Sequence, residues 1–346
     1  MRIILIGFGV VGQSLLKLIA ARETELVNSY GFRPRIVAIA DTKGSAVNSK
    51  GLDWDEMLSL KAGKHSVSSS TDFGRPGMHP LEAIESVQAE VVVEATPTNI
   101  RNGEPGLSHI KAAFRSRKHV VTTNKGPLAL AMPALIELAN YNKVCFRFSG
   151  TVGGGTPVLE LAKNGLLGDR IISIRGILNG TTNYILSEMD EGRISFREAL
   201  EQAQKLGYAE ADPSMDIDGL DTACKLVIMT NWIMNRKVTL GDVEIEGIRK
   251  IGIESLEDAA RKGRTIKLIG AVDSDLTVMP REIDRRDPLC VTGALNAVTL
   301  VSSSAGEETI IGRGAGGMET ASAVLRDLLN INRNLANPNA FGGSGW

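Results

Sequence analysis

Aromatic side chains and surplus charge are both scarce in this sequence. Aromatic residues make up 4% of the 346 residues, too few for the stacking platforms that bind single-stranded nucleic acids. The 39 lysines and arginines are balanced by 40 aspartates and glutamates, which leaves a net charge of −1. This balance provides no positive surface for nucleic acid or for an anionic membrane, so we expect a small molecule as the partner.

Cysteine and long hydrophobic runs are scarce as well. Three widely spaced cysteines are too few for a disulfide framework and are typical of a reducing compartment. They are Cys145, Cys224 and Cys290. No window reaches the ~20 apolar residues of a membrane helix, and Gln13 and Lys17 interrupt the apolar stretch that begins the chain. We therefore expect a cytoplasmic protein with no membrane segment.

Glycine, in contrast, is abundant. The 37 glycines are about 11% of the chain, against ~7% in an average protein. The remaining composition, 43% hydrophobic and 23% charged, is that of an ordinary globular protein. At roughly 100–200 residues per domain, the length predicts two domains.

Short β-rich runs alternate with helical patterns in the first half of the chain. Strands are predicted over 2–6, 35–41, 90–95, 119–123 and 143–148, and helices over 10–22, 106–117 and 131–142. Such alternation is typical of βαβ units, so we expect an α/β fold with a Rossmann-type parallel sheet. Residues 43–80, with a serine run and two prolines, are expected to form an irregular excursion.

The second half has longer helical patterns and indicates a second, mixed α+β domain, whose strand content exceeds what one substrate pocket needs, so we expect its sheet to serve dimerisation. Helices are predicted over 156–166, 181–191, 195–206 and 219–235, and strands over 170–177, 264–273 and 296–304. We expect residues 1–148 and 310–332 to form a dinucleotide-binding domain and 149–309 the second domain. Residues 333–346 lack periodicity and are expected to form a flexible tail.

A glycine-rich turn follows the first predicted strand and opens the first predicted helix. It matches the pattern G-x-G-x-x-G with Gly7, Phe8, Gly9, Val10, Val11 and Gly12. In this context the first glycine permits a tight turn, the second lets the backbone approach a pyrophosphate, and the third allows close packing of helix and strand. The pattern therefore predicts a site for NAD or NADP.

Two residues near the end of the second predicted strand bear on the choice of cofactor. Asp41 is placed to bind the 2′-hydroxyl of the adenosine ribose, and its charge would repel a 2′-phosphate. Lys43, two residues further on, could attract that phosphate. The choice between NAD and NADP therefore stays open at this point, as does the alternative that Asp41 only caps a turn.

Two further turns follow predicted strands, at the sheet edge where α/β proteins bind their ligands. Thr96, in the first turn, is placed to line the nicotinamide pocket, and Lys125, in the second, can direct a cation toward it. A solvated loop lysine is an equally good interpretation of Lys125 from its position alone.

A lysine and an aspartate lie inside the predicted helix 219–235, which has almost no polar face. Asp221 and Lys225 are one turn apart on the same side of this helix. A lysine partly removed from water beside a carboxylate is common at sites that transfer protons, although a simple surface pair is the alternative. The loop 207–219 before the helix is rich in carboxylates but does not fit a calcium loop, because Lys225 falls where the bidentate glutamate is needed. This arrangement suits a substrate that carries an ammonium group.

Longer motifs resemble one known family along nearly the whole chain, from residue 2 to about 331. They are GFGVVG, TTNKGPLAL, SGTVGGGTPVLELA, GILNGTTNYIL, GYAEADPSMDIDGLDTACK and GRGAGGMETASAVLRDL. In this order they resemble homoserine dehydrogenase, which reduces L-aspartate 4-semialdehyde to L-homoserine with NAD(P)H in the biosynthesis of threonine, methionine and isoleucine. The alternatives are another NAD(P)-dependent semialdehyde or amino-acid dehydrogenase and a non-catalytic NAD-sensing protein.

The resemblance implies roles for individual residues. Lys225 matches the proton donor of the family and Lys125 its second active-site lysine. The residues matching substrate contacts are Glu210, Asp216, Asp221, Gly180 and Thr181, and those matching further cofactor contacts are Gly207 and Gly316. It also implies a homodimer, and a chain that ends without the appended regulatory domain of some relatives.

One position departs from the family pattern. Many members bind a monovalent cation with a glutamate where this chain has Ser149, helped by backbone carbonyls that match Val152, Gly154 and Thr156. A serine hydroxyl attracts a cation less than a carboxylate does, so the departure weakens the case for the ion.

Overall fold

The computed structural model describes residues 1–336, which divide into two compact units. The first comprises Met1–Thr151 and the segment that starts at Gly316, and the second comprises Val152–Ala315. The expected boundaries of the second domain, 149 and 309, are therefore shifted. The shift at the C-terminal boundary has a physical reason: strand β13 (Gly306–Arg313) pairs along its whole length with β12 (Leu295–Ser302) and so belongs to the second unit.

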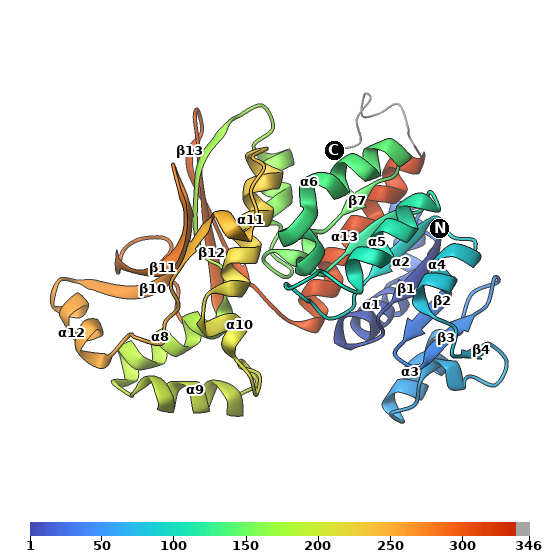
Figure 1. Cartoon of the computed structure of the whole chain (residues 1–346), viewed down its shortest axis with the longest axis horizontal. Coiled ribbons are helices and arrows are strands. Elements are labelled where there is room, and N and C mark those ends of the chain that lie inside the picture. Colours follow the sequence, from blue (N-terminus) through green and yellow to red (C-terminus); the bar gives the residue numbers. More distant parts are fainter. Residues whose placement is uncertain (337–346) are drawn as a thin grey trace. The chain divides into compact units, whose positions relative to one another are not determined.

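A seven-stranded sheet forms the first unit, as the alternating pattern predicts (Figure 1). Its parallel strands are β1 (Arg2–Ile6), β2 (Arg35–Asp41), β5 (Val91–Glu94), β6 (His119–Thr122) and β7 (Phe146–Arg147). The strand order is β4-β3-β2-β1-β5-β6-β7. From β1 the sheet continues to β2 on one side and to β5 on the other, so the strand order changes direction at β1. The carboxyl end of β1 is therefore the topological switch point at which such sheets bind ligands.

The helices of the first unit include two that lie side by side, α1 and α13 (Figure 1). The set is α1 (Val10–Ala21), α2 (Glu23–Tyr30), α3 (Trp54–Ala62), α4 (Pro80–Ser86), α5 (Gly106–Arg115), α6 (Lys125–Asn142) and α13 (Gly317–Ala336). Leu15 and Leu16 of α1 and Leu325 of α13 are buried in one core with strand residues such as Ile3 and Val93. The C-terminal helix is therefore an integral part of the dinucleotide-type domain.

Three expectations for the first unit need correction. Residues 43–80 are not irregular, because β3 (Gly44–Val47) and β4 (Gly74–Pro76) extend the sheet in antiparallel fashion around α3. The helix expected from 131 begins six residues earlier, at Lys125, where Asn124 caps it. The predicted tail is helical over its first four residues, 333–336, and its remainder, 337–346, lies outside the described residues.

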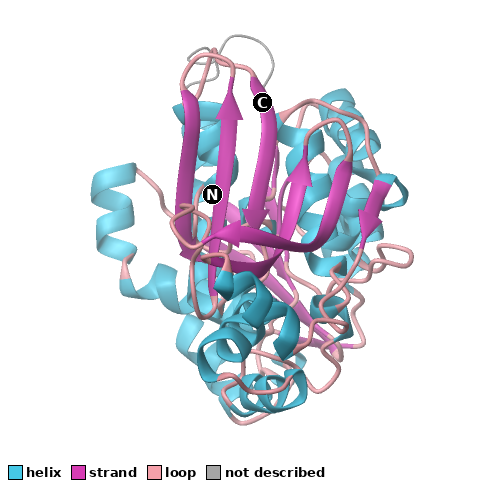
Figure 2. Ribbon diagram, turned by 90° about the vertical axis from the view of Figure 1, so that its left-hand side faces the viewer, coloured by secondary structure: helices cyan, strands magenta, loops and turns pink. Residues whose placement is uncertain are grey.

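The second unit contains a six-stranded mixed sheet, which Figure 2 shows as a layer of magenta strands. Its order is β13-β12-β8-β10-β11-β9, with β8 (Ile171–Ile177), β9 (Val243–Ile245), β10 (Arg264–Val272) and β11 (Leu276–Asp284). The helices are α7 (Val158–Glu160), α8 (Gly180–Gly192), α9 (Phe196–Lys205), α10 (Ser214–Ile217), α11 (Leu220–Ile233) and α12 (Ile253–Arg261). The predicted helix 156–166 is reduced to α7 and a π-helical turn, Leu161–Gly165.

Different parts of the chain pack on the two faces of this sheet. Helix α11 packs on one face, where Thr222 and Leu226 lie against Gly270 of β10. On the other face Leu289 and Val291, from the connection between β11 and β12, pack over the sheet residues of a small core. No helix in residues 1–336 is long and apolar enough to cross a membrane.

Candidate active site

The three glycines of the turn after β1 occupy three different environments. Gly7 has a φ of +92°, and a Cβ on it would lie 2.5 Å from the carbonyl oxygen of Ala95, which follows β5. A Cβ on Gly12 would lie 2.5 Å from the carbonyl oxygen of Gly7. A Cβ on Gly9, in contrast, would meet no atom within 4 Å. Gly7 and Gly12 are thus required by close packing, whereas Gly9 leaves open space above the turn.

This open space lies at the N-terminus of α1. Gly9 is the N-cap residue, and no side chain caps the first backbone N–H groups of the helix. These donors and the helix dipole favour an anion at this position. Val10 is exposed, Val11 is half-buried, and Phe8 is buried in the core. The turn therefore fits the pyrophosphate of a dinucleotide, with the backbone of Gly9 and Val10 as its cradle.

The start of α13 adds a second close approach to this turn within the first unit. A Cβ on Gly317 would lie 2.6 Å from Val10 Cγ1 and 2.8 Å from Ser14 Oγ. Gly316, with a φ of +137°, precedes the helix and accepts the N–H of Thr320 at 3.0 Å. The structure thus places the start of α13, with Gly316 and Gly317, beside the dinucleotide turn.

Asp41 closes β2 as predicted, but its carboxylate is occupied by its own chain. Oδ1 accepts the Ser66 hydroxyl at 2.7 Å and the N–H of Lys43 at 3.0 Å. Oδ2 accepts the Lys61 ammonium at 3.1 Å and the N–H of Val67 at 3.1 Å. Burial by itself raises the pKa of Asp41, but these hydrogen bonds outweigh it and lower the pKa. Because a carboxylate has about four acceptor positions, the group is saturated, and Lys61 neutralises its charge.

The turns after β5 and β6 are joined by a hydrogen-bond network. Asn124 Nδ2 donates to Thr96 Oγ1 at 3.3 Å and to the carbonyl of Pro97 at 3.2 Å. The Thr96 hydroxyl donates in turn to the buried carboxylate of Glu94. Thr96 is thus at the expected sheet edge, with its hydroxyl directed into the protein. Lys125 follows Asn124 as the first, half-buried residue of α6.

Lys225 is buried in α11 of the second unit, and the expected ion pair with Asp221 is present. Its ammonium lies 2.8 Å from Asp221 Oδ2 and donates to the carbonyl oxygen of Leu178 at 2.6 Å. Asn179 Nδ2 donates to Asp221 Oδ2 at 2.9 Å and to Asp216 Oδ1 at 2.6 Å. Asn179 therefore joins two carboxylates, one of which is paired with Lys225.

Asn179 was missed by sequence reasoning, although its position before Gly180-Thr181 is a signal for a helix cap. Its Oδ1 accepts the N–H of Thr182 at 2.9 Å and so caps α8. The same side chain thereby connects the start of α8 to the carboxylates beside α11. Gly180 begins α8, and the hydroxyl of the buried Thr181 donates to the carbonyl oxygen of Tyr208 at 2.7 Å.

The two carboxylates of this cluster repel each other. Burial and the nearby charge of Asp221 raise the pKa of Asp216, and hydrogen bonds from Asn179 and attraction to Lys225 offset them only in part. A raised carboxyl pKa beside a buried lysine is typical of sites that bind a cation or transfer protons.

Two predicted site residues, Glu210 and Gly207, are exposed and are not among the buried side chains of this cluster. Glu210 is exposed, and the hydrogen bond described for it uses its backbone carbonyl, which accepts Gln204 Nε2 at 3.1 Å. Gly207 has a φ of +77° and follows Leu206, the C-cap residue of α9, and the N–H of Tyr208 donates to the carbonyl oxygen of Ala203 at 2.8 Å. The left-handed cap of α9 therefore explains Gly207 without a cofactor.

The residues expected around a monovalent cation do not fit one. The Ser149 hydroxyl donates to Oδ1 of the buried Asp327 at 2.6 Å, and the Thr156 carbonyl accepts the N–H of Val158 at 2.9 Å. Val152 is buried and Gly154 has a φ of +57°, but neither supplies an anionic ligand. In the described part of the chain no group of three or more His, Cys, Asp or Glu residues is arranged to hold a metal. We therefore derive no step through an ion.

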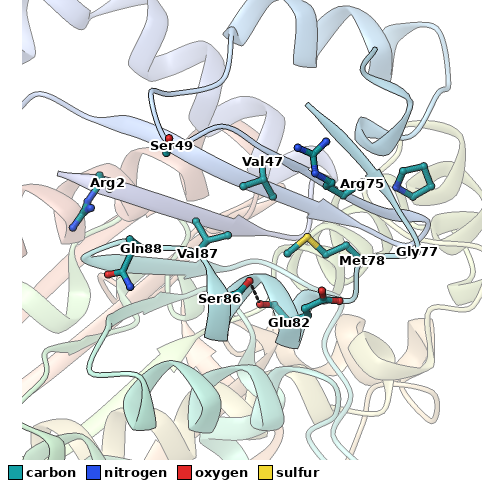
Figure 3. Close-up of a pocket in the computed structure, with 11 residues that line it drawn as sticks. Arg2, Val47, Ser49, Arg75, Gly77, Met78, Glu82, Ser86, Val87 and Gln88 are labelled. Carbon is teal, nitrogen blue, oxygen red and sulfur yellow. Dashed lines mark hydrogen bonds between the residues drawn. The ribbon is translucent and has the colours of Figure 1, made fainter. Parts of the chain in front are cut away.

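A separate cavity of about 850 Å³ lies in the first unit beside β3, β4 and α4 (Figure 3). Val47, Met78 and Val87 form its apolar part, and Arg75 and Glu82 its charged part. None of the predicted site residues lines it. Its size alone therefore does not make it the active site.

The fold and the two sets of residues together define a class of protein. A Rossmann-type sheet with an open dinucleotide turn is combined, in one chain, with a second domain that buries a lysine among carboxylates. This combination is that of an NAD(P)-dependent oxidoreductase with a dedicated substrate domain.

Comparison with known proteins identifies the family. Residues 7–149 match the family model for the NAD-binding domain of homoserine dehydrogenase, and residues 157–329 match the model for homoserine dehydrogenase. Homoserine dehydrogenase of Methanocaldococcus jannaschii is 44% identical over 332 residues, covering 96% of this chain and 98% of its own. NAD(+)-dependent homoserine dehydrogenase of Pseudomonas canavaninivorans is 40% identical over 340 residues, covering 96% of each chain. The structure of a hyperthermophilic archaeal homoserine dehydrogenase mutant in complex with NADPH superimposes with a TM-score of 0.85 at 29% identity, covering 98% of this chain and 99% of its own.

The chain therefore belongs to the homoserine dehydrogenase family and is an NAD(P)-dependent oxidoreductase that acts on a CH–OH group. The expected activity, the Rossmann-type first domain and the mixed second domain are confirmed.

Proposed function

We propose that Lys225 is the general acid in the reduction of L-aspartate 4-semialdehyde to L-homoserine. The observation that supports this role is the burial of its ammonium, of which two N–H donors are engaged by Asp221 and Leu178. The third donor remains for the aldehyde oxygen. When bound, the reduced nicotinamide supplies a hydride to the aldehyde carbon. Lys225 stabilises the negative charge that develops on the oxygen and then transfers a proton to it, so that the alcohol forms.

The substrate ammonium is assigned to the acidic side of the same cluster. Asp216 and Asp221 carry the negative charge, and Asn179 holds both carboxylates in place. The N-terminus of α8, with Gly180 and Thr181, attracts the substrate carboxylate through its backbone N–H groups and dipole. Glu210 is retained as a further substrate residue on the strength of the family motif only.

The cofactor is assigned to the first unit. Gly7, Gly9 and Gly12 shape the pyrophosphate site, and Thr96 and Lys125 flank the nicotinamide at the sheet edge. Because Lys61 neutralises Asp41, the end of β2 accepts either NADH or NADPH, with Lys43 as the additional cation. Measuring each cofactor separately decides which is preferred.

The experiment is a Lys225→Ala substitution, assayed by NADH and NADPH oxidation with aspartate semialdehyde. We expect kcat/KM to fall 10²–10⁴-fold, the usual contribution of a general acid, while the Kd of the cofactor stays unchanged. Lys267→Met is the matched control, because Lys267 is another buried lysine of the second unit and contacts Ser187 instead of the cluster. A kcat near the wild-type value in Lys225→Ala would show that Lys225 is not the general acid.

We further propose that the active protein is a homodimer formed through the sheet of the second unit. The support is a pair of exposed apolar side chains on one face of β12 and β13, Leu295 at 36% and Ile311 at 50% exposure. They share this face because Ala297, two residues after Leu295, is the direct partner of Ile311.

A further inference from the structure

A carboxylate is buried at the end of β5, where the strand pattern calls for an apolar residue. Glu94 follows three buried valines, is 0% exposed, and pairs with Ile6 of β1 and Thr122 of β6 in the sheet. Removing a charged carboxylate from water costs several kcal/mol unless hydrogen bonds replace the lost hydration. The groups that donate these compensating hydrogen bonds therefore show what the buried carboxylate holds in place.

The hydrogen bonds that Glu94 receives come from the two turns at the sheet edge. Oε1 accepts the hydroxyl of Thr96 and its backbone N–H, the latter at 3.2 Å. Oε2 accepts the Thr122 hydroxyl at 3.0 Å. The imidazole of the buried His109 places Nδ1 3.5 Å from Oε1. One carboxylate therefore holds the residues that follow β5 and those that end β6.

The network continues to the residues on both sides of Lys125. Thr122 Oγ1 accepts the N–H of Asn124 at 3.1 Å, and Asn124 Oδ1 accepts the N–H of Gly126 at 3.1 Å. Gly126 packs closely against the segment after β5, since a Cβ on it would lie 2.3 Å from the carbonyl oxygen of Asn99. The backbone of Lys125 is therefore fixed from Glu94 through Thr122 and Asn124.

The position of Lys125 itself requires such support. It is the first residue of α6, where the positive end of the helix dipole disfavours a cation. The helix dipole therefore gives no reason for a lysine at this position.

We propose that Glu94 is a positioning residue that acts through Thr96, Thr122 and Asn124 to hold Lys125 in the geometry required for hydride transfer. This inference rests on the proposed role of Lys125. Glu94 touches neither cofactor nor substrate and acts only through the two turns.

The test is the variant Glu94→Gln, which keeps the shape of the side chain but offers an amide NH₂ in place of one acceptor oxygen. We expect kcat/KM to fall about 100-fold, which is the effect of moving a reacting group by about 1 Å. Circular dichroism should show that the fold is retained. The control is Glu90→Gln, at the residue just before β5, whose carboxylate accepts Arg2 Nε at 2.9 Å and lies outside the network. Its melting temperature is expected to fall while kcat stays at the wild-type value.

A double-mutant cycle with Lys125→Ala separates positioning from general stability. If Glu94 acts through Lys125, Glu94→Gln adds less than about threefold to the loss already caused by Lys125→Ala. Multiplicative losses in the double variant would overturn the proposal, as would wild-type kcat/KM in Glu94→Gln. If Lys125→Ala had the wild-type kcat/KM while Glu94→Gln had a lowered one, the role of Lys125 in the proposed function would be wrong instead.

Discussion

At the scale of single residues, Lys267 is a buried cation outside the proposed catalytic cluster. It is 2% exposed on β10 and donates to the hydroxyl of Ser187 at 2.8 Å. Burial lowers the pKa of Lys267 from 10.5 to about 8, although the charges of Cys290 and Asp190 act in the opposite direction. Between pH 8 and 10.5 the unfolded chain therefore holds a proton that the folded chain has released, so the free energy of unfolding rises with pH across this window.

Lys267→Met tests this consequence. We expect the variant to lose most of the rise between pH 8 and 10 and to be more stable than wild type at pH 7. The upper limit of that gain is about 3 kcal/mol, reduced by the loss of the Ser187 hydrogen bond. Urea unfolding of both proteins at several pH values measures the difference, and parallel pH curves would contradict it.

Single residues also show how far the sequence could predict the site. The spacing of Asp221 and Lys225 was sufficient to predict their ion pair, because i,i+4 residues share one side of a helix. Asn179 and Glu94 were not singled out, because their roles depend on partners that are brought together by the sheets and are 28 to 42 residues away in sequence. Three of the hydrogen bonds to Asp41 were hidden for the same reason, since their donors are 20 to 26 residues away.

At the scale of elements, the turn between β1 and α1 makes a prediction that separates binding from folding. Gly9 has an ordinary φ of −81° and open space around its Cβ position, so Gly9→Ala leaves the fold intact but places a methyl group in the pyrophosphate site. We expect the Kd for NADH to rise about tenfold or more, with an unchanged melting temperature. Gly12→Ala is the matched variant, because its Cβ would clash with the Gly7 carbonyl at 2.5 Å and lower the melting temperature. Calorimetric titration and thermal melts of both variants check this contrast, and equal affinities for NADH in wild type and Gly9→Ala would refute it.

The elements themselves were predictable where one face or both faces of a strand are buried. β1, β2, β5 and β10 are almost continuously apolar and buried, and each was predicted within two residues of its bounds. β11 and β13 were missed, since Arg281 and Glu282 interrupt the first and Glu307 and Glu308 begin the second. Their place in the sheet depends on pairing with β10 and β12, a long-range effect that local periodicity does not contain.

At the scale of the whole molecule, the exposed face of β12 and β13 determines the expected assembly. Around Leu295 and Ile311, Arg175 on the neighbouring strand is already paired with Asp287 at 2.8 Å and with Glu307 at 3.3 Å. The local charges are thus largely neutralised, and the apolar side chains remain to be covered. Because β13 is an edge strand, a second copy of this face can cover them without disturbing the existing pairs.

Ile311→Glu tests the assembly. We expect wild type to have twice the chain mass of 37.0 kDa in light scattering and the variant to shift toward the single-chain mass, because the two introduced carboxylates, one from each copy, would be buried without partners in the shared face. Leu167→Glu is the control, since Leu167 is 84% exposed but lies in the connection before β8, outside this face. A variant at Ile311 that keeps the wild-type mass would show that the copies meet elsewhere. A control that dissociates equally would show that added charge, and not this face, determines the assembly.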